Sequence, residues 1–490
     1  MGPPRFGPPT GVQPVSQQDK LLAFCDEIWD RQIIPELVEY IKIPAKSPAF
    51  DANWQEHGYL KTAMDQIEDW VRRQPITGMS VERVQLPGRT PLLFIDIPGK
   101  GDDCILMYGH MDKQPEMVGW GVDLGAWKPV IAGDKLYGRG GADDGYATFA
   151  SLTAVMALQE RGLDHSRIVV VIEGCEESGS YDPPFYINHL APRIGTPSLV
   201  ICLDSGCGNY DQLWLTTSLR GLAGGTLRVR VLDEGVHSGD ASGIVPSSFR
   251  IVRNLLDRIE DVNTGRIKAE VLHVDIPAER KVQARDAAGI LGTHVYDKFP
   301  WPNGVKPMND DLAELVLNRT WRPTLSVTGA EGLPALEDAG NVLRPHTALK
   351  LSVRLPPTLD PHVASARLKE ILEKDPPYGA RIEFDVEKSS CGWAAPSLVP
   401  WLADSVDTAS KDYFGTKSAQ MGEGGTIPFM GMLQARFPDA QFVVTGLLGP
   451  KSNAHGPNEF LHIPTGKKLT AAMARIMSDH FVNRGSPTAV

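Results

Sequence analysis

Histidine and carboxylate side chains of this 490-residue chain stand where short apolar runs end. His110 directly follows CILMYG, Glu177 follows RIVVVI closely, Asp204 comes after SLVICL, and His455 follows QFVVT through a loop rich in Gly, Pro and Asn. Asp143 stands between a glycine-rich run and an apolar helix pattern. Imidazole nitrogens and carboxylate oxygens together bind divalent cations, and five such groups are a ligand set for two metal ions.

The apolar runs are predicted to be buried strands, because they are too short and too uniformly apolar for surface helices. They span residues 104–109, 167–172, 198–203 and 441–445. The pattern from Tyr146 to Arg161 predicts a helix that Gly162 would close. Ligands of open α/β sheets bind outside the carboxyl ends of the strands, so we expect the polar groups to converge there.

The donor types narrow the choice of metal. A single His or Asp after a strand is more often a cap or a turn former, so the inference depends on the whole set. His with carboxylates suits zinc, manganese or cobalt, whereas an all-oxygen set would suit magnesium or calcium. Cys202 and Cys207, a strand residue and a loop residue, make a poor zinc pair. We therefore expect an open, catalytic two-metal site.

Length and composition predict a soluble chain of two or more domains. A chain of 490 residues exceeds one ordinary core, and its apolar content of 42% allows sizeable cores. The net charge of -11 argues against a nucleic-acid or anionic-membrane partner, which would need a basic face. No apolar run is long enough to cross a bilayer, and the first residues lack the apolar core of a secretory signal. We expect a cytoplasmic protein without disulfides.

The fold is predicted to be α/β, with a mostly parallel sheet between helices and a second module inserted in it. Strand and helix patterns alternate from about Leu92 to Asp204. We expect residues 17–216 and 389–490 to form the catalytic domain, residues 217–388 to form a ferredoxin-like α+β insertion, and the Pro/Gly-rich residues 1–16 to be disordered.

Within the insertion, strands are expected at residues 226–231, 348–355 and 380–386, with a weaker signal at 324–327. Helices are expected at residues 246–259 and 360–374, the second one started by Asp360 as N-cap and Pro361 in the first turn. Residues 273–323 are longer than a connection inside a compact domain needs. They would be either a substrate-facing loop or a structured surface excursion.

Several motifs now give the chain a family resemblance. They are GHMD at 109–112, YGRGGADDG at 137–145, EGCEESGS at 173–180, LDS at 203–205, HSG at 237–239, GEGGTIP at 422–428 and the late His455. This set closely resembles the co-catalytic di-zinc aminopeptidase-like hydrolases, which include aminoacylase and carboxypeptidase relatives. Within this family it is most similar to the branch of carnosinase and cytosolic non-specific dipeptidase. The resemblance spans nearly the whole chain after residue 17.

The resemblance implies two divalent metal ions in each subunit, Zn2+ first and Mn2+ or Co2+ as alternatives. Asp143 would bridge the two ions. His110 and Asp204 would complete one site, and Glu177 and His455 would complete the other.

The resemblance also implies two catalytic carboxylates. Glu176 would be the general base for a water activated by both metals, and Asp112 would orient the ring of His110. Glu176 and its neighbour Glu177 cannot easily face the same ion, so one ligand and one proton carrier is a natural division. A solvated acidic turn is the alternative.

On the substrate side, the resemblance implies five further contacts. His237 resembles a histidine that crosses a dimer interface to hold the carbonyl oxyanion in the partner's active site, and Asn341 falls at a small polar contact. Arg354 aligns with an arginine that binds the substrate carboxylate. Gly425 and Thr426 would present backbone N–H groups to the C-terminal end of the substrate. A surface loop histidine and an ordinary strand ion pair are the alternatives for His237 and Arg354. The insertion would be the lid and dimerisation domain of a homodimer.

The chain departs from the family pattern at two motifs. Relatives commonly read Asp-Asp-Lys-Gly where this chain has Asp143-Asp144-Gly145-Tyr146, and Gly422 stands where an arginine often precedes Glu-Gly-Gly. These departures and the 273–323 segment leave the size and charge of the substrate open. The resemblance also predicts a cis peptide bond between Asp143 and Asp144.

The leading hypothesis is a metallodipeptidase that cleaves the amide bond of dipeptides or short peptides with a free C-terminal carboxylate. An N-acyl-amino-acid or carbamoyl amidohydrolase is the alternative, because the same scaffold carries several amide cleavages. A catalytically inactive scaffold protein is disfavoured, since all seven metal and catalytic positions are filled.

Overall fold

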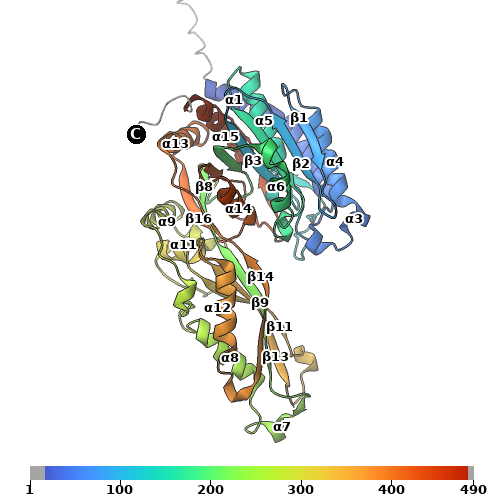
Figure 1. Cartoon of the computed structure of the whole chain (residues 1–490), viewed down its shortest axis with the longest axis vertical. Helices are drawn as coiled ribbons and strands as arrows, with labels where there is room; N and C mark the ends of the chain where they lie inside the picture. The colour runs from blue at the N-terminus through green and yellow to red at the C-terminus, as the bar shows by residue number, and fades with distance from the viewer. Residues whose placement is uncertain (1–16, 484–490) are drawn as a thin grey trace, which may run out of the picture.

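The computed structural model describes residues 17–483, so the predicted disorder of residues 1–16 lies outside the described residues. Figure 1 shows an upper body and a narrower lower lobe. The body contains a six-stranded sheet, and the lobe is a four-stranded sheet with its helices. The fold is mixed α/β, as predicted. Within residues 17–483, no helix combines the length and the apolar composition that a membrane crossing would need.

The six-stranded sheet is mixed. In order across the sheet its strands are β1 (Ser80–Val84), β2 (Leu92–Ile97), β6 (Arg167–Glu173), β3 (Cys104–His110), β7 (Leu199–Cys202) and β17 (Gln441–Val444). The pairs from β6 to β17 are parallel, as the sequence predicted, whereas β1 and β2 add antiparallel pairs. The link at residues 98–103 is too short to carry the chain back along the sheet, so β2 runs opposite to β3 and is antiparallel to β6, which lies between them.

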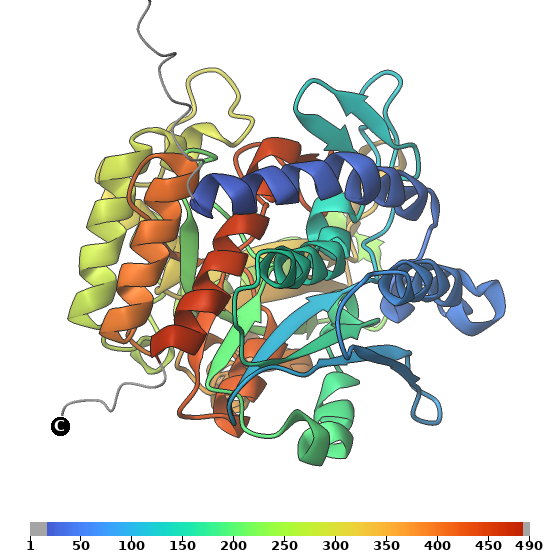
Figure 2. The ribbon, with the colours of Figure 1, turned by 90° about the horizontal axis from the view of Figure 1, so that it is seen from above.

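Helices cover both faces of this sheet (Figure 2). One face packs against α1 (Gln17–Ile28), α2 (Ile34–Lys42), α4 (Tyr59–Arg72), α5 (Tyr146–Glu160), α13 (Pro400–Phe414) and α15 (Ile463–Asn483). The other face packs against α6 (Pro183–Ile194) and α14 (Pro428–Arg436). In β3, Ile105 and Met107 join the first core and Leu106 and Tyr108 join the second, which is the alternation of a strand buried on both sides.

Two small sheets extend the body. One contains β15 (Trp393–Ala394), β8 (Trp214–Leu219) and β16 (Ala419–Glu423), and the other contains β18 (Phe460–His462), β5 (Lys135–Tyr137) and β4 (Val130–Ala132). The short helix α3 (Trp54–His57) precedes α4.

The 273–323 segment is a structured excursion. It contains α9 (Ala278–Leu291), α10 (His294–Asp297) and α11 (Leu312–Thr320). Ala287 and Leu317 from these helices share a core with Trp214 and Met421 of the β15-β8-β16 sheet, so the segment packs against the body.

The lobe has the chain order β9, α8, β11, β13, α12, β14. Its sheet runs β11 (Thr324–Glu331), β13 (His346–Leu355), β9 (Gly221–Arg230) and β14 (Arg381–Ser390), all pairs antiparallel. Helices α8 (Ser248–Ile259) and α12 (Pro361–Glu373) share one core with this sheet. The Asp360 side chain accepts the backbone N–H groups of His362 and Val363, so the predicted N-cap is confirmed. At the free end of the lobe, β10 (Val236–His237) pairs with β12 (Val342–Leu343) beside α7 (Ser238–Ala241).

Candidate metal centre

The candidate metal centre lies at the carboxyl ends of three neighbouring strands, β6, β3 and β7. His110 is the last residue of β3, and Asp204 follows β7 by two residues. Glu177 lies in a short turn after β6, Glu176–Ser178. Asp143 lies in the turn Gly141–Gly145 that enters α5, and His455 lies in the loop after β17. The parallel strands therefore bring residues distant in the sequence to one edge of the sheet.

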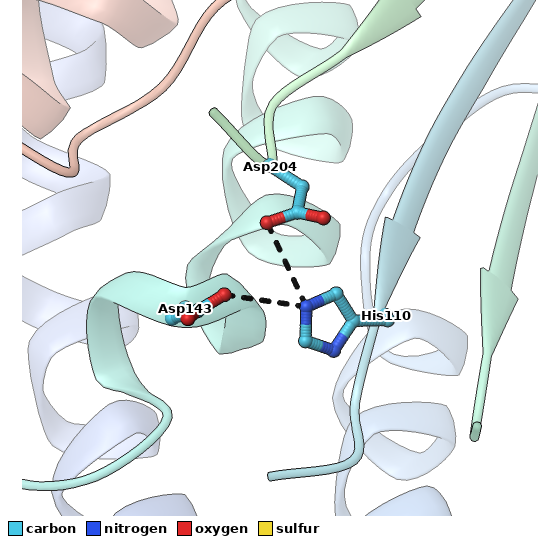
Figure 3. Close-up of side chains that lie close together, drawn as sticks. All are labelled: His110, Asp143 and Asp204. Atoms are coloured by element: carbon cyan, nitrogen blue, oxygen red, sulfur yellow. Dashed lines mark ion pairs between the residues drawn. The ribbon is translucent and has the colours of Figure 1, made fainter. Parts of the chain in front are cut away.

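Two histidines face different oxygens of the same carboxylate. His110 Nε2 lies 3.4 Å from Asp143 Oδ1 and 3.7 Å from Asp204 Oδ1 (Figure 3). His455 Nε2 lies 3.1 Å from Asp143 Oδ2 and 3.2 Å from Glu177 Oε2. The five predicted ligands thus form two groups of three that share Asp143.

The donor atoms fit a pair of divalent cations. His110 Nδ1 lies 3.0 Å from the backbone carbonyl of Asp112, which accepts its N–H and leaves the lone pair of Nε2 free. Nε2 is buried and makes no hydrogen bond within residues 17–483, which is unusual for a polar atom unless a cation binds there. Nitrogen with carboxylate oxygens suits zinc, manganese or cobalt.

The electrostatics of the centre also favour positive charge. Burial alone would lower the pKa of His110, but Asp204, Asp112 and Asp143 raise it well above its ordinary value. Burial and neighbouring carboxylates raise the pKa of Glu177 well above its ordinary range, against the opposing charge of His455. Closely spaced carboxylates in a buried site are stabilised by bound cations, which is what a metal pair would provide.

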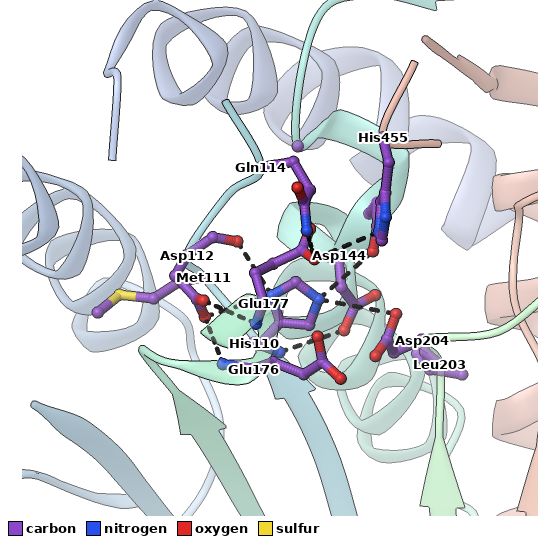
Figure 4. Close-up of polar contacts among 12 residues, drawn as sticks. His110, Met111, Asp112, Gln114, Asp144, Glu176, Glu177, Leu203, Asp204 and His455 are labelled. Carbon is purple, nitrogen blue, oxygen red and sulfur yellow. Dashed lines mark hydrogen bonds and ion pairs between the residues drawn. The ribbon is translucent and has the colours of Figure 1, made fainter. Parts of the chain in front are cut away.

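Asp112 contacts the acidic turn as well as His110. Its Oδ1 accepts the backbone N–H of Glu176 at 3.1 Å, and its Oδ2 accepts that of Glu177 at 3.0 Å (Figure 4). Oδ1 also lies 3.5 Å from His110 Nδ1, farther away than the backbone carbonyl of Asp112. The sequence predicted that the Asp112 carboxylate accepts the ring N–H of His110. In the structure the backbone carbonyl of Asp112 is the nearer acceptor, and the carboxylate holds the Glu176–Glu177 turn.

The two adjacent glutamates point in different directions. The Glu177 carboxylate accepts an N–H of the Gln114 side chain at 2.6 Å and faces His455. The Glu176 carboxylate lies on the Asp204 side in Figure 4. Burial and the charge of Asp204 raise the pKa of Glu176 well above its ordinary value. A carboxyl group of raised pKa beside the metal ligands is suited to carry a proton.

The substrate residues proposed from the sequence fall into two groups. Arg354 Nη1 donates to Thr426 Oγ1 at 3.0 Å, and the backbone carbonyl of neighbouring Gly425 accepts the N–H of Arg220 at 3.0 Å. His237 is the last residue of β10, and Asn341 directly precedes β12, where its backbone carbonyl accepts the N–H of Ser238. This second group is at the free end of the lobe, away from the strands that carry the metal centre (Figure 1).

Sequence reasoning missed a buried ion pair that joins the loops of the candidate ligands Asp143 and His455. Arg139 Nη1 contacts Glu459 Oε2, and the other oxygen of Glu459 accepts the backbone N–H of Gly140 at 2.8 Å. Arg139 Nη2 also donates to the carbonyl of Gly456, next to His455, at 2.7 Å. No spacing in the sequence connects two residues so far apart. The predicted cis peptide bond between Asp143 and Asp144 is confirmed.

This fold and centre belong to a known class of peptidases. Residues 106–479 match the sequence model of Peptidase family M20/M25/M40. The match covers well over half of the chain, and the protein belongs to this family.

Named relatives agree with this assignment. The chain is 27% identical over 366 residues to a cysteinylglycine-S-conjugate dipeptidase from Corynebacterium striatum, covering 72% of this chain and 76% of the relative. It is 26% identical over 427 residues to the beta-Ala-His dipeptidase of Mus musculus, covering 82% of each. The solved structure of the di-peptidase Dug1p from Saccharomyces cerevisiae superposes with a TM-score of 0.76 at 20% identity, covering 96% of this chain and 99% of that one, which shows the shared fold.

Proposed function

We propose that the protein is a metal-dependent dipeptidase that hydrolyses the amide bond of dipeptides or short peptides. The observation that carries this proposal is the carboxylate of Asp143, whose two oxygens face two separate groups of ligands beside Glu176. Membership of the peptidase family and the dipeptidase names of the relatives support the substrate class. The same names do not favour the alternative of an N-acyl-amino-acid or carbamoyl amidohydrolase.

His110 and Asp204 would hold one divalent cation, Glu177 and His455 would hold the other, and Asp143 would contact both. When bound, two such cations, Zn2+ in the first place, would polarise the scissile carbonyl. They would also lower the pKa of a water molecule, so that it can give up a proton as it attacks the carbonyl carbon. Gln114 steadies the Glu177 carboxylate, and the backbone carbonyl of Asp112 fixes the tautomer of His110.

Glu176 would move the proton of the reaction. Its carboxylate accepts a proton from the attacking water and then donates it to the leaving amine. The raised pKa of Glu176 makes it a stronger proton acceptor than an ordinary carboxylate. Asp112 accepts the Glu176 N–H and therefore fixes the position of this turn relative to His110.

Arg354 would bind the C-terminal carboxylate of the substrate, with Thr426 and Gly425 beside it. A guanidinium group matches a carboxylate with two parallel hydrogen bonds. Thr426 Oγ1 already accepts from Arg354 Nη1, so the side chain is held in place before a substrate arrives.

The assembly and the domain roles are also part of the proposal. We assign the catalytic domain to residues 17–216 and 389–490, and the lid and dimerisation role to the ferredoxin-like lobe within residues 217–388, with α9 and α11 packed on the body. His237 and Asn341 would then reach the active site of a second subunit in a cytoplasmic homodimer.

A substrate panel tests the proposal. The purified protein, loaded with Zn2+ or Mn2+, should release free amino acids from dipeptides at rates well above those for N-acetyl amino acids of matched side chains. Arg354→Gln should raise KM for dipeptides more than it lowers kcat, whereas substitution of the exposed Arg285 should not change KM. Faster cleavage of the N-acyl compounds would instead support the amidohydrolase.

A further inference from the structure

Arg220 lies where the chain passes from the body into the lobe. It is the one residue between β8 of the body and β9 of the lobe (Figure 1). Residues 321–323 connect α11 to β11, and residues 391–392 connect β14 back to β15. A Cβ atom on Gly221 would lie 3.1 Å from the backbone nitrogen of Gly392, so the first and the last of these connections lie against each other. Arg220 is therefore placed to contact both parts of the molecule.

The side chain of Arg220 is buried and links three separate segments. Its Nη1 donates to Thr324 Oγ1 at 2.9 Å, at the start of β11. The same nitrogen lies 3.4 Å from the backbone carbonyls of Asn318 and Arg322. Its Nε donates to the carbonyl of Gly424 at 3.2 Å, in the loop after β16. One guanidinium group thus connects the end of α11, the first residue of β11 and the loop that continues to Thr426.

The backbone of Arg220 holds the same loop. Its N–H donates to the carbonyl of Gly425 at 3.0 Å, and its carbonyl accepts the hydroxyl of Thr426. Thr426 Oγ1 in turn accepts from Arg354 Nη1 at 3.0 Å. A Cβ atom on Gly424 would lie 3.3 Å from Arg220 Nη2, which is close packing. Arg220 therefore fixes the hydroxyl group that holds Arg354, the residue proposed to bind the C-terminal carboxylate of the substrate.

The charge around Arg220 also suits an anion. Within residues 17–483, its side chain donates hydrogen bonds to neutral oxygens only. Burial and the charges of Arg354 and Arg319 lower the pKa of Arg220 to about 9, against the opposing charge of Glu423. A bound carboxylate would stabilise these neighbouring positive charges.

We infer that Arg220 is a positioning residue for the C-terminal carboxylate of the substrate. It holds the loop of residues 424–426 at the passage from body to lobe, so that Thr426 keeps Arg354 in the orientation that binds the carboxylate. Arg220 itself does not need to contact the substrate. This inference rests on the proposed dipeptidase function and adds a residue that acts through Arg354.

Matched substrates test the inference. The metal-loaded full-length protein is assayed with Ala-Ala and with Ala-Ala amide, which lacks the C-terminal carboxylate. Arg220→Met should lower kcat/KM for Ala-Ala about fivefold, the effect of one intramolecular hydrogen bond, chiefly through KM. The value for the amide should stay nearly the same. Arg220→Lys, which keeps the charge but loses the fork of donors, should change the ratio of the two substrates in the same direction and by less.

Arg280→Met is the matched control. Arg280 is also a buried arginine, but its side chain donates to Gln283 Oε1 and to the carbonyl of Ala395. Its replacement removes a similar group without touching the loop of residues 424–426, so the ratio of Ala-Ala to the amide should not change. Equal losses for both substrates in Arg220→Met would show a purely structural role and overturn the inference.

A double variant tests whether Arg220 acts through Arg354. Arg354→Gln alone should lower the ratio of Ala-Ala to its amide. Residues that act through one another are not independent, so Arg220→Met combined with Arg354→Gln should lower the ratio by less than the product of the two single effects. A full product of the two effects would contradict the inference, because Arg220 would then act without Arg354.

Binding separates this inference from the proposed function. Titration calorimetry of Ala-Ala and its amide into metal-loaded Glu176→Gln protein, with and without Arg220→Met, reports recognition of the carboxylate without turnover. If Ala-Ala binds more tightly than the amide and Arg220→Met removes the difference, the inference holds even when the wild-type protein cleaves neither compound, and only the dipeptidase proposal fails. Equal binding of both compounds before the substitution, or a difference that survives it, overturns the inference.

Discussion

At the residue scale, the different roles proposed for Glu176 and Glu177 depend on what each carboxylate contacts. Glu177 faces His455 and is held by Gln114, so it is placed as a ligand. The carboxylate of Glu176 has neither contact, and its pKa is raised by burial and by Asp204. Replacing Glu176 should therefore change turnover, whereas replacing Glu177 should change metal binding.

Glu176→Gln should keep both metal ions and lower kcat by about 10²- to 10⁴-fold, the usual contribution of a general base. The amide is nearly the same size as the carboxyl group but cannot carry the proton. Metal analysis alongside steady-state kinetics checks this expectation. The control is Glu177→Gln, which should lose metal. Wild-type kcat in a fully loaded Glu176→Gln protein would contradict the mechanism.

Glu173 provides a pH-dependent test of stability. Burial and the charge of Asp112 raise its pKa to about 7, while Tyr108 and Ser180 donate hydrogen bonds to it. A carboxyl group of raised folded pKa binds its proton more tightly in the folded state. Its contribution to stability is therefore complete below the unfolded pKa and declines as pH rises towards 7.

Glu173→Gln should remove this decline, because the amide oxygen still accepts from Tyr108 and Ser180 without a proton to lose. Relative to the wild type, the free energy of unfolding of the variant should improve by about 1 kcal/mol or more between pH 5 and pH 8. Chemical unfolding of both metal-free proteins measures this difference. A difference independent of pH would show that Glu173 ionises normally.

The positions of four candidate ligands were predictable because each comes after an apolar run, and that of Asp143 because it stands between a glycine-rich run and an apolar helix. Contacts between distant loops were not. The ion pair of Arg139 with Glu459 and the approach of Arg319 to Glu423 leave no spacing signal, since both depend on how separate elements pack. The backbone N–H groups that Asp112 accepts could be located only after the turn at Glu176 was placed.

At the scale of elements, the loops of Asp143 and His455 are connected by the pair of Arg139 and Glu459. Both side chains are buried, and together they contact the backbone of Gly140 and Gly456. A buried ion pair is costly to break on one side, because an unpaired charge remains. This pair therefore holds the loops of Asp143 and His455 together, and we expect it to position these two candidate ligands.

Glu459→Gln should weaken metal binding at the His455 site by about 10- to 100-fold, the range for residues that orient ligands. The protein should retain one tightly bound ion of two, as measured by metal analysis after dialysis against a weak chelator. Asp96→Asn is the control, because Asp96 forms a two-contact ion pair with Arg167 across strands β2 and β6. Equal metal content in both variants would show that the pair has no positioning role.

The strands of the parallel core were predictable because their burial makes them continuously apolar. The edge strand β1 and the small sheet of β15, β8 and β16 were not, because short strands outside a continuous core carry a weak pattern. The pattern does begin at Leu92, where β2 starts, but it does not give the antiparallel direction of that strand. The sequence indicated that residues 273–323 are longer than a connection needs. Their packing on β8 and β16 was not predictable, because it depends on a surface that exists only in the folded chain.

At the scale of the whole molecule, the lobe separates two sets of proposed site residues. His237 precedes α7 at the free end of the lobe, whereas the metal ligands lie in the body (Figure 1). One chain therefore presents an incomplete site if His237 contacts the substrate. In the proposed symmetric dimer, each lobe would reach the body of the other subunit and complete its site.

Mixed dimers distinguish this arrangement from a site completed within one chain. His237→Ala and Glu176→Gln should each be nearly inactive as homodimers. When the two variants are co-expressed, half of the dimers contain one chain of each kind. The chain with His237→Ala then keeps Glu176 and receives His237 of the partner subunit, so one of the two sites is complete. Activity should return to about a quarter of the wild-type value, half of the dimers with half of their sites. If His237 acts within its own chain, or not at all, the mixture has no more activity than the average of its parents, since no site regains both groups by mixing.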